Sequence, residues 1–155
     1  MKRRDPLADV PPMRYGSKPV DGGHLIFTEK EKKAFLEQEP GSEQYFRPFM
    51  GADELLYGYK RWCLWLKNVS PVEWRSLPLV KAQVEAVRVF RQMSKKKPTR
   101  EMADYPTLFA EDRQPENDYL ALPEVSGESR DYLPVALLPS SVMLREALNN
   151  SQSWS

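Results

Sequence analysis

Basic side chains are concentrated in one stretch of the sequence, where they could bind an anion. Residues 78–100 carry seven Lys and Arg residues against Glu85, a local charge of +6, whereas the whole chain has a net charge of +1. The next stretch, residues 101–131, carries nine acids against Arg113 and Arg130, a local charge of −7. This asymmetry is typical of an anion-binding face with an acidic flank, and also of a solvated helix beside an acidic loop. Charge alone favours the solvated helix.

Residues suited to catalysis do not form a recognisable site. The chain has one His and one Cys, His24 and Cys63, so it lacks the clustered ligands of a His/Cys metal site. A Cys–His nucleophilic pair is disfavoured because Cys63 lies in an apolar predicted strand, where burial opposes the thiolate. No glycine-rich phosphate loop is present, and the acids of residues 111–131 have no spacing that singles out an acid–base pair. We therefore expect no catalytic residue in this chain, and His24 to lie in a turn or at the start of a strand.

Length and composition indicate one folded, soluble domain. With 155 residues, 41% of them hydrophobic and 29% charged, the chain can bury a core and is not broadly disordered. A single cysteine excludes a disulfide framework and favours a reducing, cytoplasmic location. No apolar run reaches the roughly 18 residues that a membrane helix needs, so no membrane contact is expected.

Local signals predict an α+β fold with a small mixed or antiparallel sheet, a hairpin, one long helix and several short helices. Thr28 stands three residues before Glu31, the capping-box spacing that starts a helix. Ser70 and Glu73 repeat this spacing, with a proline at the first helical position. Residues 60–67 place apolar side chains on both faces and predict a buried strand. Helices are predicted over 29–39, 52–57, from 71 onward, over 79–94 and over 99–104.

The helix over residues 79–94 is predicted to separate a core face from a basic face. Its apolar positions at helical spacing are assigned to the core: Leu79, Ala82, Ala86, Phe90 and Met93. Lys81, Arg88 and Lys95 recur every seven residues on a different stripe, which is expected to face solvent. The lysine run that ends at Lys97 must leave the helix before Pro98.

The last third of the chain predicts a β-hairpin followed by a tail. Two strand-like runs, residues 119–125 and 132–138, flank a polar loop at 126–131. Residues 142–148 could form one amphipathic helical turn, and the polar residues 149–155 are expected to fray. Together these signals divide the chain into an extended lead-in over 1–20, a domain over 21–143 and a tail over 144–155.

Short blocks spread along the chain are informative as a set. They are MRYGSKPVDGGHL at 13–25, YFRPFMG at 45–51, KRWCLWL at 60–66, and further blocks at 109–120, 125–134 and 137–139. In this order they resemble the target-recognition region of MmeI-like single-chain restriction–modification enzymes. Each block is weak alone, but their joint order is specific and covers roughly residues 13–143.

The resemblance implies a recognition domain that reads DNA for an enzyme outside these residues. In that family one polypeptide carries a nuclease, an S-adenosylmethionine-dependent adenine methyltransferase and a recognition domain. The methyltransferase motif Asn-Pro-Pro-aromatic is missing, because Val10-Pro11-Pro12-Met13 has neither the amide nor the aromatic ring. We expect no cofactor in this chain, and S-adenosylmethionine, with Mg²⁺ as a further candidate, in a parent methyltransferase with or without an endonuclease. Since the family's recognition region continues further, the end at Ser155 suggests truncation or divergence.

The expected partners are double-stranded DNA and the methyltransferase domain of the same polypeptide. Lys and Arg supply sequence-independent attraction to phosphates, and polar side chains on loops discriminate between bases. The expected phosphate contacts are Arg88, Lys95, Lys96, Lys97 and Arg100. The expected base-reading residues are Arg113, Gln114, Ser126, Glu128, Ser129 and Arg130, since Arg suits guanine, Gln adenine and Glu cytosine. Ion pairs with neighbouring acids are an equal alternative for Arg113 and Arg130.

Two other functions stay open at this point. The basic helix and the acidic loop could dock on complementary surfaces of the parent enzyme, which would make this a protein-interaction domain. A small stand-alone hydrolase would need turnover that depends on Cys63 or His24. The DNA-binding hypothesis makes a geometric prediction, namely that the basic helix and the tip of the hairpin lie next to each other on one surface.

Overall fold

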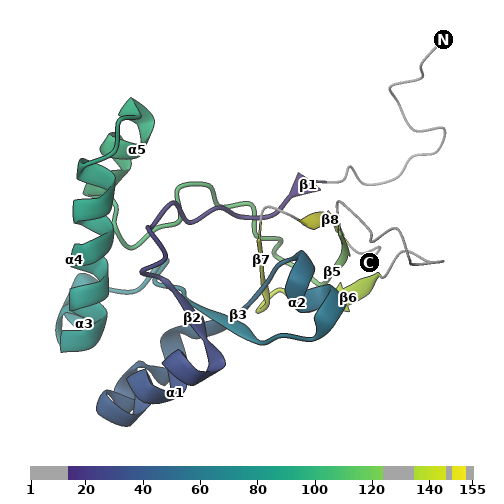
Figure 1. Cartoon of the computed structure of the whole chain (residues 1–155), viewed down its shortest axis with the longest axis horizontal. Helices are drawn as coiled ribbons and strands as arrows, with labels where there is room; N and C mark the ends of the chain where they lie inside the picture. The colour runs from purple at the N-terminus through teal and green to yellow at the C-terminus, as the bar shows by residue number, and fades with distance from the viewer. Residues whose placement is uncertain (1–13, 124–134, 146–147, 153–155) are drawn as a thin grey trace.

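The computed structural model describes residues 14–123, 135–145 and 148–152 of the chain (Figure 1). The longest helix is α4 (Pro78–Gln92). The shorter helices are α1 (Glu29–Gln38), α2 (Ala52–Tyr57), α3 (Pro71–Arg75) and α5 (Lys97–Glu101). Two 3-10 segments follow α1 and α5, and these are η1 (Pro40–Tyr45) and η2 (Met102–Asp104).

The first of two four-stranded sheets is mixed and has the strand order β2-β4-β3-β7. Its strands are β2 (Ile26–Thr28), β3 (Phe46–Met50), β4 (Arg61–Leu64) and β7 (Met143–Leu144). β4 runs antiparallel to β2 and to β3, with Trp62 opposite both Phe27 and Pro48, whereas β7 joins β3 in parallel. Cys63 and Leu64 are both fully buried, so β4 is covered on both faces, as its sequence predicts.

The second sheet is antiparallel, in the order β1-β8-β5-β6. Its strands are β1 (Arg14–Tyr15), β5 (Tyr119–Pro123), β6 (Ala136–Leu138) and β8 (Leu148–Gln152). Tyr119 pairs with Leu138 and Ala121 with Ala136, so the two predicted arms do form an antiparallel pair. The α+β class is confirmed, with one mixed and one antiparallel sheet.

Local capping signals account for where the short helices begin. The Thr28 hydroxyl accepts a hydrogen bond from the Glu31 N–H (3.2 Å), which confirms the predicted start of α1. The Ser70 hydroxyl accepts one from the Val72 N–H (3.3 Å) at the start of α3. α2 spans the residues predicted for it. These boundaries follow from a few neighbouring residues in each case.

α4 begins at a proline, as predicted, but its cap comes from a distant residue. Glu39, just after α1, is largely buried and accepts hydrogen bonds from the N–H groups of Leu79 (2.6 Å) and Val80 (3.3 Å). Its negative charge also lies at the positive end of the helix dipole. Because Glu39 and Leu79 are 40 residues apart, no local pattern indicates this contact.

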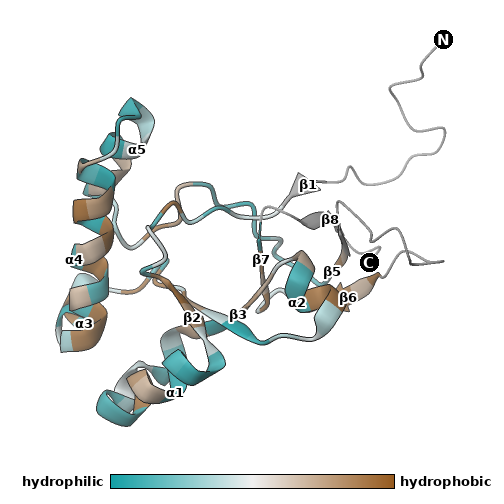
Figure 2. Ribbon diagram, viewed as in Figure 1, coloured by the Kyte–Doolittle hydropathy of each residue, from teal (hydrophilic) through white to brown (hydrophobic). Residues whose placement is uncertain are grey.

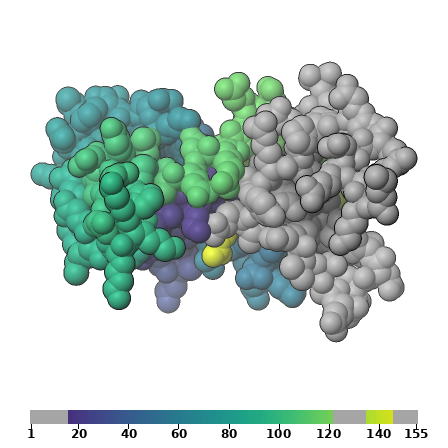
Figure 3. All heavy atoms as spheres, turned by 90° about the horizontal axis from the view of Figure 1, so that it is seen from above, coloured from purple at the N-terminus to yellow at the C-terminus, as the bar shows by residue number. Residues whose placement is uncertain are grey.

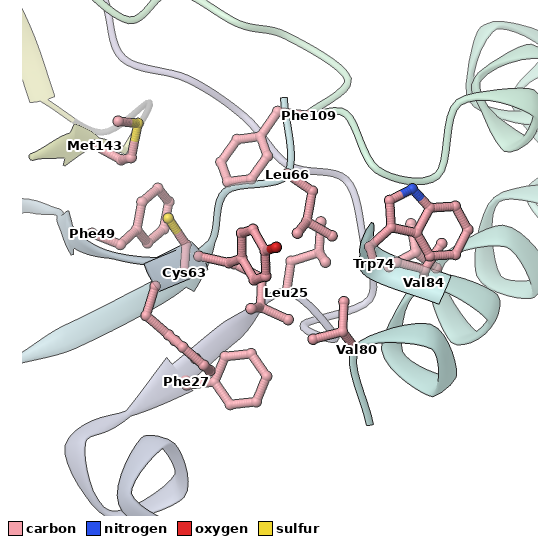
Figure 4. Packing of buried hydrophobic residues seen from close by; sticks show 14 of the residues in the cluster. Leu25, Phe27, Phe49, Cys63, Leu66, Trp74, Val80, Val84, Phe109 and Met143 are labelled. Atoms are coloured by element: carbon pink, nitrogen blue, oxygen red, sulfur yellow. The ribbon is translucent and has the colours of Figure 1, made fainter. Parts of the chain in front are cut away.

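The main apolar core joins the first sheet to α1, α3 and α4 (Figure 4). The rings of Phe27, Phe35 and Phe46 meet edge to face, with centroids 5.1–5.4 Å apart. α4 contributes Val80 and Val84, which are fully buried. A smaller cluster joins the second sheet to β7, through Tyr119, Ala121, Leu138 and Leu144. The molecule therefore has two apolar centres of unequal size, and the smaller one lies between the sheets.

α4 buries a different face from the one its sequence was expected to bury. Three valines on it are completely buried: Val80, Val84 and Val87. Arg91 continues this stripe and is also fully buried. The predicted core residues Phe90 and Met93 are instead 42% and 80% exposed, and Ala82 is exposed. The predicted period is right but the phase is wrong, because assigning the charged Arg91 to solvent rotates the helix.

Both ends of the described chain are built into the sheets. β1 lies within the predicted lead-in over 1–20, and Ser17, just after it, is fully buried. β7 lies where a helical turn was predicted over 142–148, and β8 lies within the predicted frayed tail. β8 pairs with both β1 and β5, so these expectations of an extended lead-in and a frayed tail are wrong for the described residues.

The helices α3, α4 and α5 form a column at one end of the molecule, whereas β5, β6 and β8 lie at the opposite end (Figure 1). Figure 2 shows α5 as predominantly hydrophilic and β2, nearer the middle, as hydrophobic. The strands of the predicted hairpin are therefore far from the basic helix. The predicted tip of the hairpin, residues 126–131, lies outside the described residues, so its position next to the basic helix stays a prediction.

Candidate nucleic-acid interface

Four exposed basic residues lie together where α4 passes into α5. This basic turn, as we call it, consists of Lys95, Lys96, Lys97 and Arg100. The Lys96 N–H donates a hydrogen bond to the Ser94 hydroxyl (3.2 Å), and the Arg100 guanidinium donates one to the Ser94 carbonyl (3.0 Å). α5 begins at Lys97, with Lys96 as its N-cap, so this helix starts two residues before the predicted start at residue 99.

Ion pairs engage part of this basic region. Lys97 lies 3.9 Å from Glu101, one turn along α5, and both side chains are strongly exposed. Arg88, on α4, pairs with Glu85 at 3.0 Å. Exposed pairs of this kind contribute little free energy, so these cations can exchange their partner for another anion. Within the described residues, no ion pair engages Lys95 or Lys96.

Arg91 differs from the other bases of residues 78–100. Its guanidinium donates five hydrogen bonds of 2.6–3.1 Å to backbone carbonyls. The acceptors belong to two segments, residues 19–20 and residues 102–108, the second of which begins with η2. Burial lowers the pKa of Arg91, and the nearby charge of Asp21 opposes this shift. Arg91 therefore holds the fold together and is not part of the basic surface.

A groove of about 430 Å³ lies beside the basic turn. Phe90 lines it from α4, Ser94 and Lys96 line it from the turn between α4 and α5, and Lys18 and Glu111 line it from two irregular segments. The Lys18 N–H donates a hydrogen bond to the Glu111 carbonyl (2.9 Å), which joins these segments. In Figure 3 the N-terminal segment (purple) and the segment near residue 110 (light green) meet between the two ends of the molecule. The groove thus extends the basic turn toward the middle of the chain's surface.

Arg113, a predicted base-reading residue, is exposed and lies next to the N-terminal segment. Its guanidinium forms an ion pair with Glu111 (2.7 Å), and its backbone N–H donates to the buried Ser17 hydroxyl (2.9 Å). This ion pair is the alternative to base contact that the acidic residues near Arg113 suggest in the sequence. Because that pair is exposed, it does not prevent the guanidinium from binding another group.

Gln114, the next predicted base-reading residue, uses its side-chain amide within the chain. The amide NH₂ donates to the carbonyls of Ser140 (2.9 Å) and Val142 (2.7 Å). The amide oxygen accepts a hydrogen bond from the Leu144 N–H (3.2 Å). These contacts attach the segment before β5 to the segment that leads into β7.

The other predicted base-reading residues lie outside the described residues, and these are Ser126, Glu128, Ser129 and Arg130. β5 and β6, which flank them in sequence, lie at the end of the molecule opposite α5 (Figure 1).

A second cleft, of about 320 Å³, contains basic residues that no sequence pattern singled out. Lys18, Arg61 and Arg145 line it together with Asp21. Lys18 and Val20 line both this cleft and the groove beside the basic turn, so the two hollows adjoin. The three cations come from distant parts of the sequence and are brought together by strand pairing, which leaves no local signal.

His24 and Cys63, the two residues considered for catalysis, lie in a turn and in a strand. His24 lies in the turn before β2, as predicted, and Cys63 is fully buried in β4, where burial raises the pKa of its thiol. In the part of the chain that the structure describes, no group of three or more His, Cys, Asp or Glu side chains could hold a metal ion. No described helix is both long and apolar enough to cross a bilayer.

Comparison with known proteins identifies the family. A model of the MmeI target recognition domain matches residues 1–153. The chain belongs to this family. The structure of the Type IIL restriction-modification enzyme MmeI in complex with DNA is similar to 99% of this chain, with a TM-score of 0.93 and 42% sequence identity. DNA methyltransferase A of Bacillus subtilis (strain 168) is 32% identical over 142 residues, or 92% of this chain.

This MmeI-type recognition domain corresponds to a small part of each relative. It covers 21% of the MmeI chain and 16% of the Bacillus methyltransferase. The sequence-based resemblance to the MmeI-like recognition region is confirmed over nearly the whole chain.

Proposed function

We propose that this recognition domain binds double-stranded DNA and reads a target sequence for a methyltransferase domain in the same polypeptide. The observation that carries the proposal is the basic turn, an exposed cluster of cations in a domain whose structural relative, MmeI, was solved in complex with DNA. The methyltransferase domain would hold S-adenosylmethionine, and an attached nuclease would use Mg²⁺. The chain would act in the cytoplasm and would not itself catalyse a reaction.

The basic turn and Arg88 would contact the phosphate backbone. Lysine and arginine bind phosphates through charge, which positions a protein on DNA without selecting a sequence. The exposed ion pairs of Arg88 and Lys97 would give way to phosphates, because such pairs contribute little free energy.

Base reading would fall to polar side chains that can form hydrogen bonds with base edges. Arg113 would exchange its exposed partner Glu111 for a guanine edge. The four remaining candidates are Ser126, Glu128, Ser129 and Arg130. For Gln114 we propose a positioning role, since its amide already has three partners within the chain.

A charge-neutralisation experiment tests the phosphate contacts. Lys95→Gln/Lys96→Gln removes two exposed cations from the basic turn, and Lys30→Gln/Lys33→Gln removes two exposed cations from α1. The binding of a labelled duplex is measured by fluorescence anisotropy over a series of salt concentrations. We expect the basic-turn variant to bind about tenfold or more weakly at 0.1 M salt, and its salt slope to fall by about 2. The α1 variant should bind like the unmodified chain.

Each other outcome contradicts the proposal in a specific way. Equal losses in the two variants would mean that net charge, and not the basic turn, attracts DNA. A chain that binds no DNA even at low salt, but forms a stable complex with the parent's other domains, would instead be a protein-interaction domain.

A further inference from the structure

The cleft lined by Lys18, Arg61 and Arg145 is a second concentration of positive charge, separate from the basic turn. Arg145 follows β7 directly in the sequence. The backbone N–H of Arg145 donates a hydrogen bond to the Met50 carbonyl (2.8 Å) at the end of β3, and this contact brings Arg145 to the cleft. We propose that this cleft binds a phosphate of the DNA backbone. This inference rests on the proposed DNA binding and adds a contact site that sequence patterns did not indicate.

The buried carboxylate of Glu54 holds the Arg61 side chain in position. Its Nε–H donates to the Glu54 carboxylate at 3.0 Å, and the Glu54 side chain is only 3% exposed. Glu54 also accepts a hydrogen bond from the Gly51 N–H (2.9 Å), which fixes the carboxylate in turn. With Nε engaged, the two terminal nitrogens of Arg61 have no other partner within the described residues. An arginine held in this way presents a planar pair of donors, which suits a phosphate.

Arg145 reaches the same cleft because a glycine makes room for its side chain. A Cβ atom at Gly51 would lie 3.1 Å from Arg145 Cδ and 2.7 Å from the Glu54 carboxylate. Both approaches are closer than ordinary contacts, so a larger residue at Gly51 would displace one side chain or the other. Gly51 thus lets Arg145 and the carboxylate that holds Arg61 lie close together.

The acidic residue in the cleft does not cancel its positive charge. Asp21 is largely buried, and its two carboxylate oxygens accept hydrogen bonds from the N–H groups of Gly23 (3.0 Å) and Leu25 (2.6 Å). Three cations therefore stand against two carboxylates, Asp21 in the lining and the Glu54 that pairs with Arg61, and both carboxylates already accept backbone hydrogen bonds. The lining keeps a net positive charge, which favours an anion.

The position of Lys18 connects this cleft to the basic turn. Lys18 lines both the cleft and the groove that contains Lys96, so basic side chains follow one another from α5 to the first sheet. A DNA backbone presents phosphates at regular intervals and can occupy such a series of sites. A single free anion would need only one of them, so the arrangement favours the polymer.

The test compares matched double variants of the whole chain on the same DNA duplex. Lys18→Gln/Arg145→Gln removes two cations from the cleft, Lys95→Gln/Lys96→Gln removes two from the basic turn, and Lys30→Gln/Lys33→Gln is the control. We expect the cleft variant to bind about tenfold or more weakly at 0.1 M salt, with a salt slope lower by about 2. The charge-preserving variant Lys18→Arg/Arg145→Lys should keep the slope of the unmodified chain.

The outcomes separate this inference from the function on which it rests. If the cleft variant binds like the control while the basic-turn variant binds weakly, the second phosphate site is wrong and DNA binding stands. If the salt slope of the charge-preserving variant also falls, the substitutions act by disturbing the fold, and the proposed phosphate site is wrong. If the unmodified chain binds no duplex at low salt, both the site and the proposed function are wrong.

Discussion

The helical end and the sheet end of the molecule each hold irregular backbone in place with one polar side chain, but of different kinds. At the helical end, Arg91 donates to carbonyls of residues 19–20 and 102–108, two segments that pack against α4. At the sheet end, Gln114 bonds two carbonyls and one N–H next to β7. In both places the side chain bonds to backbone groups of segments that are distant in the sequence.

The difference between the two side chains follows from the backbone groups that need a partner. Around Arg91 all five groups are acceptors, and a guanidinium offers five N–H donors and no acceptor. Around Gln114 there are two acceptors and one donor, which an amide matches with its NH₂ and its oxygen. The buried charge of Arg91 is therefore stabilised by carbonyl groups and by the nearby Asp21, with no ion pair in contact among the described residues.

The largest loss of stability is expected from Arg91→Met. Methionine fills much of the same space but removes five side-chain hydrogen bonds, although the carbonyls of Pro19, Met102 and Tyr105 keep a backbone donor. Hydrogen bonds to charged groups contribute about 1.5–3 kcal/mol each, and water can replace some of them, so the free energy of unfolding should fall by about 3–5 kcal/mol. Urea denaturation followed by tryptophan fluorescence measures this change.

Arg88→Met is the matched control, since it removes an arginine from the same helix three residues earlier. Arg88 is partly exposed and pairs with Glu85 on the surface, so its loss should change stability by less than about 0.5 kcal/mol. Equal losses for the two variants would contradict the distinction between the buried and the surface arginine.

A smaller loss is expected at the sheet end from Gln114→Leu. The leucine leaves two carbonyls and one N–H without their side-chain partner, and neutral hydrogen bonds contribute less than charged ones. The free energy of unfolding should fall by about 1–3 kcal/mol in the same urea experiment. Gln92→Leu, at the exposed end of α4, should leave it nearly unchanged. A loss as large as that of Arg91→Met would show that charge does not set the two ends apart.

The same comparison explains which parts of the fold could be predicted from the sequence. Thr28 and Ser70 cap their helices through the next few residues, so these starts are visible in the sequence. The buried face of α4 is not visible in the sequence in this way. Arg91 continues a stripe of valines, and only its distant carbonyl partners explain why this charged side chain is buried. β8 was missed for a related reason, since its polar residues become a strand only by pairing with β1 and β5.

The candidate interface divides in the same way. The basic turn is a run of neighbouring residues, so both its charge and its exit from the helix could be read locally. The second cleft depends on the parallel pairing of β7 with β3 and on the segment that contains Lys18. Contacts of this range need the whole fold to be known, and spacing along the chain does not reveal them.

The smallest expected effect at moderate pH, and the one with a pH signature, is that of Tyr119→Phe at the sheet end. Tyr119 is fully buried, and its hydroxyl donates to the same Val142 carbonyl that Gln114 bonds (2.5 Å). Loss of this hydrogen bond should lower the free energy of unfolding by about 0.5–1.5 kcal/mol at pH 8. Burial raises the pKa of Tyr119 from 10.0 to about 12.

The raised pKa of Tyr119 determines the direction in which stability changes with pH. Because the phenol loses its proton more readily in the unfolded chain, its contribution to stability is complete below pH 10 and is lost as the pH rises to 12. The stability difference between the unmodified chain and Tyr119→Phe should therefore shrink over this interval, measured by urea denaturation at each pH. Tyr59→Phe, at an exposed tyrosine, should show no such trend. A difference that stays constant from pH 8 to 12 would mean that the Tyr119 hydroxyl is not held in the interior of the second sheet.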